Sequence, residues 1–252
     1  MLYFIAQLLV RFIGGVLFRV EVIGRENVPE AGCLVVSNHL SWTDTIFVMY
    51  ALPRAPRLWT MANETSVFNT RFKRWLMPKL CVFPIRRNRG LLDEQAVNRV
   101  YDLLNAGERV LIFPEGAYGK DGVLRPLKDG VGYFALNSGK PLLPVSLTGT
   151  GRLRPFSRVT VEIGVPFIPD PPTMWDLKER VAATVAAVRD RLGRMGRRAT
   201  QVRRRGLMRW HRRRGSAGGE QTPGVEADQA EVQDGESHTD EDQAQQGHDQ
   251  RA

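Results

Sequence analysis

Short apolar runs rich in β-branched residues alternate with amphipathic segments over most of this chain, and this alternation restricts the fold more than any other feature. Runs of this kind predict β-strands, and the amphipathic segments predict α-helices. The predicted strands are residues 20–23, 33–37, 57–61, 82–85, 110–113, 142–147 and 159–163, and the predicted helices are residues 42–51, 67–76, 91–106, 130–137 and 174–192. Helices interleaved with strands favour a single α/β domain with a mixed, mostly parallel sheet flanked by helices.

The C-terminal part of the chain differs in charge from the rest. Residues 215–252 contain ten acidic residues and one arginine, a net charge of −9. Because the whole chain carries +9, residues 1–214 carry +18. A positive field of this size favours an anionic partner: a phospholipid surface, a nucleic acid or a phosphate-bearing substrate. Large apolar residues almost vanish from residues 215–252, which predicts a disordered acidic tail.

An arginine-rich segment precedes this tail. Residues 189–214 contain twelve arginines and one acid, Asp190. Such a segment either prolongs a helix whose basic face lies on anionic lipid or forms an exposed arm that binds nucleic acid. We expect the folded structure to fade near Leu192. The predicted organisation is therefore a helix over residues 1–19, an α/β domain over 20–192, a basic segment over 193–214 and the tail over 215–252.

The first 19 residues are mostly apolar but contain Arg11 and Arg19. A spanning helix needs about 20 apolar residues, and a charge at its centre costs about 2.5–3.5 kcal/mol. A helix that lies in the membrane interface, with both arginines at headgroup level, avoids this cost. We therefore predict a membrane-associating helix over residues 1–19, with a spanning helix or a core-packing helix as alternatives. No cleavage site of the A-x-A type follows, which argues against a cleaved signal peptide.

Several classes of site are disfavoured by what the sequence lacks. The two cysteines, Cys33 and Cys81, are too few for a disulfide framework and lack the spacing of a metal site. They fit a reducing, cytoplasmic environment better than secretion. The G-x-S-x-G motif of α/β hydrolases and a complete P-loop motif are also missing. We expect neither a metal ion nor a bound cofactor.

His39 is the one histidine of four that lies in the region predicted to fold. It follows a predicted strand, and Asp44 comes five residues later. Five helical residues turn through about 500°, so the two side chains can meet only if His39 precedes the helix and Asp44 lies in its first turn. An imidazole suits a general base, and a carboxylate would orient it. The alternative is that Asp44 only closes the helix end, as the acid of a capping box that begins at an N-cap Ser41.

A second motif, Phe113-Pro-Glu-Gly116, ends another predicted strand. Glu115 and Gly116 should therefore lie at the carboxyl edge of the sheet, where ligands bind in open α/β folds. Gly116 permits close approach of a ligand to the backbone, and Glu115 supplies an acceptor that could orient a hydroxyl. The alternative is a strand-to-loop turn with a solvated glutamate.

Four segments together resemble the signatures of the glycerophospholipid acyltransferase superfamily, specifically of the 1-acylglycerol-3-phosphate acyltransferases. Asn38-His39-Leu-Ser-Trp-Thr-Asp44 matches the first signature, N-H-x-x-x-x-D, and Phe113-Pro-Glu-Gly116 matches the core of the third. Cys81-Val-Phe-Pro-Ile-Arg-Arg87 is similar to the second, and Pro141-Leu-Leu-Pro-Val145 to the fourth. The motifs occur in the family's order and cover about residues 20–169.

This resemblance implies transfer of a fatty acyl group from acyl-CoA or acyl-carrier protein, as co-substrate, to the free hydroxyl of 1-acylglycerol-3-phosphate. The product would be phosphatidic acid, in phospholipid biosynthesis. His39 is the implied general base, Asp44 its orienting partner, and Arg87 the ligand of the acceptor's phosphate. The residues expected to bind substrate are Asn38, Arg87, Glu115, Gly116 and Lys128. Membrane phospholipids are the expected partners, with peripheral or monotopic attachment to the cytoplasmic face of the cell membrane.

The chain also departs from the family pattern. The second signature usually begins with glycine, where this chain has Cys81, and the third usually continues with Thr-Arg, where it has Ala117-Tyr118. The cations that could compensate for the lost arginine are Arg86, Arg87, Arg89, Lys120, Arg125 and Lys128. One alternative is therefore a related acyltransferase for another lysophospholipid or polar lipid. Another is a non-catalytic protein that binds nucleic acid or anionic membranes through its arginines, but this explains none of the four motifs, and we expect no nucleic-acid partner.

Overall fold

The computed structural model describes residues 1–88, 91–92, 94–120 and 123–215, with residues 87–88, 91–92 and 197–215 described by their backbone alone. The chain divides into two compact units, Met1–Trp210 and His211–Ala252. All the strands described below belong to the first unit. The predicted disordered tail lies outside the described residues beyond Gly215.

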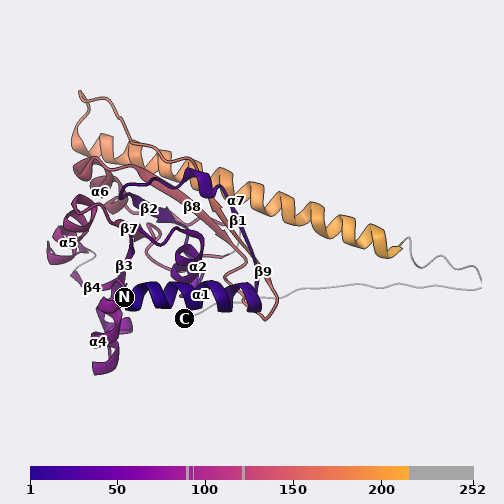
Figure 1. The fold of residues 1–252 in the computed structure, drawn as a ribbon. Coiled ribbons are helices and arrows are strands. Elements are labelled where there is room, and N and C mark those ends of the chain that lie inside the picture. Colours follow the sequence, from indigo (N-terminus) through magenta and orange to yellow (C-terminus); the bar gives the residue numbers. More distant parts are fainter. Residues whose placement is uncertain (89–90, 93, 121–122, 216–252) are drawn as a thin grey trace, which may run out of the picture. The chain divides into compact units, whose positions relative to one another are not determined.

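A seven-stranded sheet forms the centre of the first unit (Figure 1). Its strands are β1 (Arg19–Ile23), β2 (Leu34–Ser37), β3 (Leu58–Asn63), β4 (Val82–Ile85), β7 (Arg109–Ile112), β8 (Leu142–Thr148) and β9 (Arg158–Ile163), in the order β1-β9-β8-β2-β7-β3-β4. Every neighbouring pair is parallel except β8 and β9. A separate antiparallel hairpin pairs β5 (Arg87–Asn88) with β6 (Leu91–Leu92). The predicted α/β class and the mixed, mostly parallel sheet are thus confirmed.

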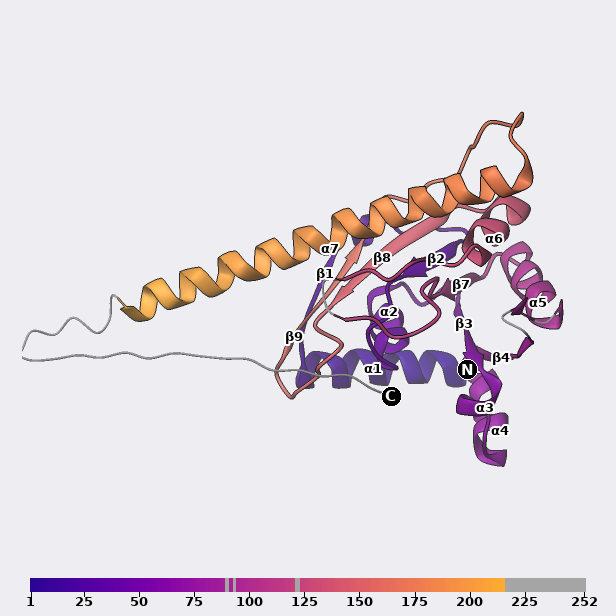
Figure 2. The ribbon, with the colours of Figure 1, turned by 180° about the vertical axis from the view of Figure 1, so that it is seen from behind.

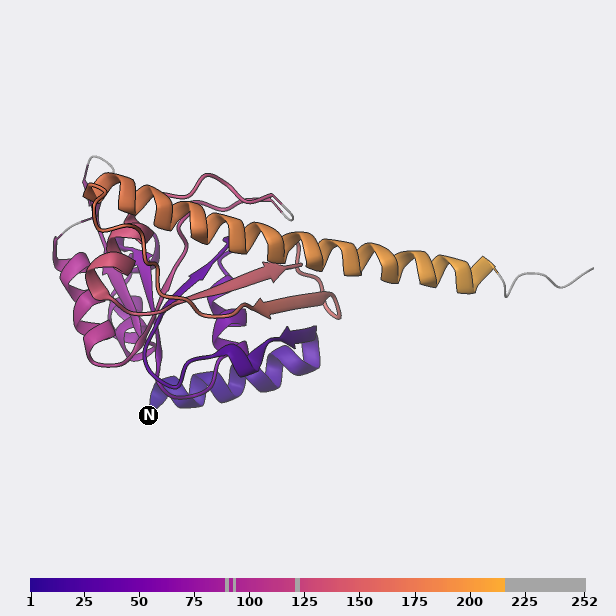
Figure 3. The ribbon, with the colours of Figure 1, turned by 90° about the horizontal axis from the view of Figure 1, so that it is seen from above.

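Helices cover both faces of this sheet. They are α1 (Leu2–Leu17), α2 (Asp44–Ala51), α3 (Glu64–Val67), α4 (Arg71–Lys79), α5 (Glu94–Asn105), α6 (Gly130–Ser138) and α7 (Leu177–Gly215), with a 3₁₀ turn, η1, at Arg25–Asn27. Figures 1, 2 and 3 show α7 along one face and α1 with α2 on the opposite face. The central strands β2, β7 and β8 are buried almost throughout, because helices cover them on both sides. The edge strand β1 alternates between exposed and half-buried residues.

Two predicted helices differ from the observed ones. The segment predicted as one helix over residues 67–76 is divided between α3 and α4. Thr70 is extended between them, and its side chain accepts the N–H of Lys73, so it caps a new helix. The helix predicted over residues 91–106 begins only at Glu94, since Leu91 and Leu92 pair with β5 instead.

Two predicted helix boundaries also need correction. The N-cap of α2 is Thr43, not Ser41, because the Ser41 hydroxyl accepts the N–H of Thr43 within a turn that precedes the helix. The predicted end of structure near Leu192 is also wrong for the backbone, because α7 continues to Gly215. Arginine, which accounts for ten of the 23 residues from 193 to 215, is a good helix former. Of the two alternatives for the basic segment, the backbone therefore adopts the helical one.

Helix α1 turns its polar residues toward the protein and its apolar residues outward. Gln7 is fully buried and donates to the carbonyl oxygens of Met49 and Leu52, at 2.9 and 3.1 Å. Arg11 donates to the carbonyls of Tyr50 and Leu52, at 3.2 and 2.7 Å. These carbonyls lie at the C-terminal end of α2, which lacks intrahelical partners for them and favours a cation. Arg11 thus has partners within the protein, and its position at headgroup level stays a prediction. None of the helices within the described residues has the length and apolarity needed to cross a membrane.

Candidate active site

The two principal motifs meet at one edge of the sheet. His39 follows the carboxyl end of β2, and Glu115 follows that of β7. Because β2 and β7 are parallel neighbours, the two loops lie side by side, as expected for strands whose carboxyl ends share an edge. The N–H of His39 donates to Glu115 Oε1 at 2.9 Å, and the N–H of Gly119 donates to the carbonyl of His39 at 2.6 Å. These bonds join the two motifs directly.

His39 and Asp44 form the predicted hydrogen-bonded pair. His39 Nδ1 lies 2.8 Å from Asp44 Oδ2, with the carboxylate fully buried and the imidazole 17% exposed. His39 precedes α2 and Asp44 is its first residue, which is the arrangement that the five-residue spacing required. An imidazole that donates from Nδ1 has Nε2 as its proton acceptor. The pair therefore has the geometry of a general base with an orienting carboxylate.

Asp44 also closes the start of α2, as the alternative interpretation expected, although the N-cap is Thr43 and not Ser41. Its Oδ2 accepts the N–H groups of Leu40 at 2.5 Å and Ser41 at 2.8 Å. These bonds close the turn that leads from His39 into α2, so the carboxylate holds the loop and the imidazole at the same time. The two interpretations of Asp44 are compatible, and only kinetics can divide its effect between them.

Thr150 is a site residue that sequence reasoning missed. It is 1% exposed, and its hydroxyl lies 2.5 Å from Asp44 Oδ1, to which it donates. This bond satisfies the carboxylate oxygen that does not face the imidazole, and it fixes the rotation of the carboxylate plane. Thr150 lies 106 residues after Asp44 and beyond the last motif, so no local pattern points to it.

Two aromatic residues position the imidazole ring. Phe113 stacks on His39 with ring centroids 3.8 Å apart and planes 13° apart. Tyr118 approaches the same ring edge-on at 4.4 Å and is 54% exposed. Tyr118 is the residue that stands where the resembling family usually has arginine. An aromatic side chain thus lies beside His39 at a place where the family usually has a cation.

Glu115 is held by the backbone on both carboxylate oxygens. Oε1 accepts the N–H of His39, and Oε2 accepts the N–H of Arg125 at 3.0 Å. The side chain of Glu115 is only 4% exposed, and its two bonds hold the loop of His39 against the loop that follows β7. It is not the solvated glutamate of the alternative interpretation. Contact with the acceptor's glycerol stays a prediction.

Gly116 and Lys128 lie against each other. Gly116 has a φ of +67°, a left-handed conformation that favours glycine. A Cβ at this position would lie 2.8 Å from Lys128 Cε, so the lysine stem passes directly over the glycine. The positive φ is the reason for glycine here, because the far end of the flexible lysine side chain could shift to admit a Cβ. Substrate binding by the two residues stays a prediction, as does compensation by Lys128 for the missing arginine.

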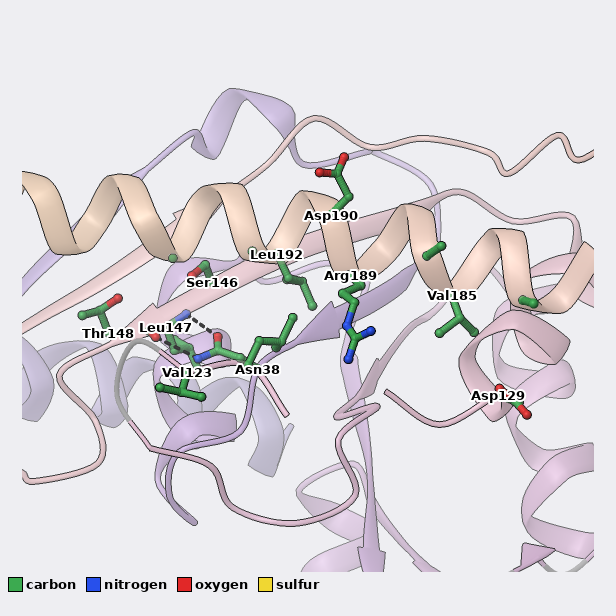
Figure 4. A pocket seen from close by; sticks show the side chains of 15 residues that line it. Asn38, Val123, Asp129, Ser146, Leu147, Thr148, Val185, Arg189, Asp190 and Leu192 are labelled. Carbon is green, nitrogen blue, oxygen red and sulfur yellow. Dashed lines mark hydrogen bonds between the residues drawn. The ribbon is translucent and has the colours of Figure 1, made fainter. Parts of the chain in front are cut away.

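Asn38 connects the active-site loop to a cavity on the α7 side of the sheet. Its amide donates to the carbonyl of Leu147 at 3.0 Å and accepts the N–H of the same residue at 2.7 Å. The cavity measures about 670 Å³ and has a mainly apolar lining that includes Val123, Leu124, Leu147, Val185 and Leu192 (Figure 4). Arg189 extends from α7 toward the sheet at this cavity, whereas Asp190 points away from it.

The arginines proposed as phosphate ligands are only partly described. Arg87 belongs to β5, but its side chain lies outside the described residues, as does Arg89 altogether. Arg86 forms an ion pair with Glu64, in which Nη2 donates to Oε1 at 2.9 Å. Arg125 donates to the carbonyl of Tyr118 at 3.2 Å. Phosphate binding by Arg87 therefore stays a prediction.

Neither cysteine resembles a nucleophile. Both are buried, and burial raises the pKa of the Cys33 thiol to about 12 and that of Cys81 to about 11. A thiolate is the reactive form, so both groups are unreactive near neutral pH. Over the described ranges, no group of three His, Cys, Asp or Glu side chains is placed to hold a metal ion.

Comparison with known proteins supports the resemblance seen in the four motifs. Residues 19–148 match the family model described as Acyltransferase. The chain is 31% identical to a chloroplastic 1-acyl-sn-glycerol-3-phosphate acyltransferase of Brassica napus over 140 residues, which cover 55% of this chain and 40% of the relative. It is 33% identical to a lyso-ornithine lipid O-acyltransferase of Pseudomonas aeruginosa over 141 residues, which cover 56% of this chain and 51% of that protein. The match thus spans only about two fifths to one half of these relatives.

A solved structure shares the fold. The 1-acyl-sn-glycerophosphate acyltransferase PlsC from Thermotoga maritima superposes with a TM-score of 0.62 at 22% identity, covering 77% of this chain and 79% of that one. The matched family region begins at the first residue of β1 and ends at the last residue of β8, so it contains the paired loops of His39 and Glu115. The chain therefore belongs to the Acyltransferase family.

Proposed function

We propose that this protein transfers a fatty acyl group from a thioester donor to the free hydroxyl of a lysophospholipid, with 1-acylglycerol-3-phosphate as the acceptor. The observation that supports this most strongly is the His39–Asp44 pair at the carboxyl edge of the sheet, at 2.8 Å. The Brassica napus relative is an acyltransferase for this acceptor by its name. The donor is acyl-CoA or acyl-carrier protein, and the product is phosphatidic acid.

The reaction needs a base, and His39 supplies it. Asp44 accepts the hydrogen bond from His39 Nδ1–H and stabilises the imidazolium that forms. Thr150 and two backbone N–H groups hold the Asp44 carboxylate in place. Nε2 removes the proton from the acceptor hydroxyl, whose oxygen attacks the thioester carbonyl. The C–S bond then breaks, and the leaving thiolate takes the proton from the imidazolium. General-base catalysis contributes about 10²–10⁴-fold, and positioning of the two substrates contributes much of the rest.

The acceptor's identity depends on Tyr118, and a second candidate follows from it. A cation beside the base would favour a phosphate-bearing acceptor, but this chain places an aromatic ring at 4.4 Å from His39. The Pseudomonas aeruginosa relative is, by its name, an acyltransferase for lyso-ornithine lipid. A lysolipid without a phosphate is therefore the second candidate acceptor.

Attachment to a membrane fits helix α1. Its outward face exposes a continuous set of large apolar side chains, including Phe12 at 71%, Val16 at 57% and Leu8 at 53%. On its inward face, the donor groups of Gln7 and Arg11 are paired with carbonyls at the end of α2. A helix with this orientation can bury its apolar face in the outer part of one leaflet without crossing it. We place the protein on the cytoplasmic face of the cell membrane as a peripheral or monotopic enzyme.

A panel of lipid acceptors tests the proposal. Purified protein is incubated with one labelled acyl-CoA and with lysophosphatidic acid, lyso-ornithine lipid and neutral lysolipids, and the products are resolved by mass spectrometry. We expect acylation to be fastest with lysophosphatidic acid and to be lost in His39→Ala. Absence of transfer to every acceptor, or a His39→Ala rate above about a tenth of wild type, would contradict the proposed reaction, given the usual size of a general-base contribution.

A further inference from the structure

Helix α4 contributes no buried side chain to the fold. Phe72 is 65% exposed and Trp75 is 56% exposed, and these large aromatic residues occupy one face because they are three positions apart. A helix in a soluble domain ordinarily buries its apolar face against the core. α4 instead presents two aromatic rings to the surroundings, so its sequence is not explained by packing within the described part of the chain.

Cations accompany these aromatic rings. The helix contains Arg71, Lys73, Arg74 and Lys79 and no acidic residue. The ring centroids of Phe72 and Trp75 are 6.1 Å apart, and Lys79 Nζ lies 3.9 Å from the centre of the Trp75 ring. Exposed aromatic residues surrounded by lysine and arginine are typical of helices that lie in the headgroup layer of an anionic membrane.

The position of α4 connects this surface with the active site. α3 and α4 follow the carboxyl end of β3, which is parallel to β7 and next to it in the sheet. They therefore leave the sheet at the edge that also carries the loops of His39 and Glu115. Figures 1 and 2 show α4 projecting on the same side of the sheet as α1 and beyond it.

We propose that α4 is a second membrane contact, in which Phe72 and Trp75 insert into the headgroup layer of an anionic bilayer and the surrounding cations bind lipid phosphates. The aromatic rings provide apolar contact, and the positive charge of the helix complements the negative surface. Contact here, in addition to α1, turns the active-site edge toward the lipid layer in which a lysolipid acceptor resides. The inference rests on the proposed attachment to a membrane, but not on the acyl-transfer reaction.

Binding to vesicles in the absence of substrates tests this contact. The full chain is mixed with vesicles of phosphatidylcholine and phosphatidylglycerol, and the partition coefficient is measured by sedimentation. We expect Phe72→Ala/Trp75→Ala to lower the coefficient at least about tenfold, because two apolar side chains no longer leave water. Lys73→Gln/Lys79→Gln should lower it about 25-fold on these vesicles, about fivefold for each cation, and hardly at all on pure phosphatidylcholine.

Trp175 supplies the matched control. It is an exposed tryptophan two residues before α7, the helix that Figures 1 and 2 show on the opposite side of the sheet from α4. Trp175→Ala should bind vesicles as tightly as the wild type does. Brominated lipids should quench the fluorescence of Trp75 but not that of Trp175. All variants should keep the wild-type melting temperature, because the aromatic pair of α4 lies outside the core.

Three results would overturn the inference. The first is vesicle binding by Phe72→Ala/Trp75→Ala that equals that of wild type or of Trp175→Ala. The second is no quenching of Trp75 in vesicle-bound protein. The third is self-association in solution that Phe72→Ala/Trp75→Ala abolishes while vesicle binding is unchanged, which would assign this face to a second copy of the chain. Loss of acyl transfer with normal vesicle binding would instead count against the proposed reaction alone.

Discussion

Replacing Asp44 with asparagine should separate catalysis from folding. We expect Asp44→Asn to lower turnover by about 10²–10⁴-fold, while the free energy of unfolding falls by only about 1–3 kcal/mol. The large kinetic effect follows from the 2.8 Å bond between His39 Nδ1 and Asp44 Oδ2. A neutral amide cannot stabilise the imidazolium that forms when His39 takes a proton.

The small effect on stability follows from the partners of the carboxylate. The amide oxygen can replace Oδ2 and still accept the N–H groups of Leu40 and Ser41. The amide NH₂ then faces Thr150, whose hydroxyl can rotate and accept. What is lost is the charge assistance, because a bond to a charged group contributes about 1.5–3 kcal/mol and a neutral one about 0.5–1.5 kcal/mol. Asp44→Ala, in contrast, leaves all these donors unpaired and should be much less stable.

Single-turnover acyl transfer and urea unfolding measure the two effects on the same preparations. Thr150→Val and Thr150→Ser serve as control variants that leave the carboxylate unchanged. Thr150→Val removes the hydroxyl that donates to Oδ1, and Thr150→Ser keeps it. We expect Thr150→Val to lose about tenfold in turnover, as a positioning effect within the range of a single hydrogen bond, and Thr150→Ser to remain near wild type. Asp44→Asn with more than about a tenth of wild-type turnover would show that Asp44 only holds the turn before α2.

Three further predictions concern residues where the chain departs from expectation. Cys81 has a φ of +61°, so Cys81→Gly should be more stable than Cys81→Ala by about 1 kcal/mol in urea unfolding, and the reverse order would refute this strain. The buried guanidinium of Arg109 donates to the carbonyls of four residues in two proline-containing loops. Arg109→Met should therefore lower the free energy of unfolding by about 2–4 kcal/mol, and Arg109→Lys should recover less than half of this loss. Equal urea-unfolding midpoints for the wild type and both variants would contradict this prediction. Tyr118→Arg should raise the ratio of kcat/KM for lysophosphatidic acid over a phosphate-free lysolipid by about 10- to 150-fold, and an unchanged ratio would remove Tyr118 from acceptor selection.

The fold and the centre of the site could be predicted from local patterns. Apolar runs of strand length identified every strand of the main sheet. The signal is clearest for the central strands β2, β7 and β8, because a strand covered on both faces must be apolar almost throughout. The His39–Asp44 pair could also be predicted from the sequence, since five residues and one helix turn define its geometry. The break between α3 and α4 was missed because a single capping residue, Thr70, outweighs the apolar pattern that crosses it.

Polar contacts between distant residues could not be predicted. Thr150 reaches Asp44 across 106 residues, and Arg109 reaches Pro29 across 80. Each is an ordinary residue in its own segment, and its role exists only once the strands have assembled. Arg11 shows the same limit in another form, because its charge suggested lipid headgroups although its partners are carbonyls of α2.

The inward polar face of α1 has a consequence for the order in which the protein is made. Gln7 and its acceptor Met49 are 42 residues apart, so a ribosome that adds 5–20 residues per second makes the acceptor about 2–8 s after the donor. From the addition of Leu17 until that of Met49, α1 has no carbonyls for its polar side chains, while its apolar face is already complete. A nearby bilayer can take up this face before the sheet exists. Capture of the nascent chain at the lipid surface would then precede folding of the enzyme.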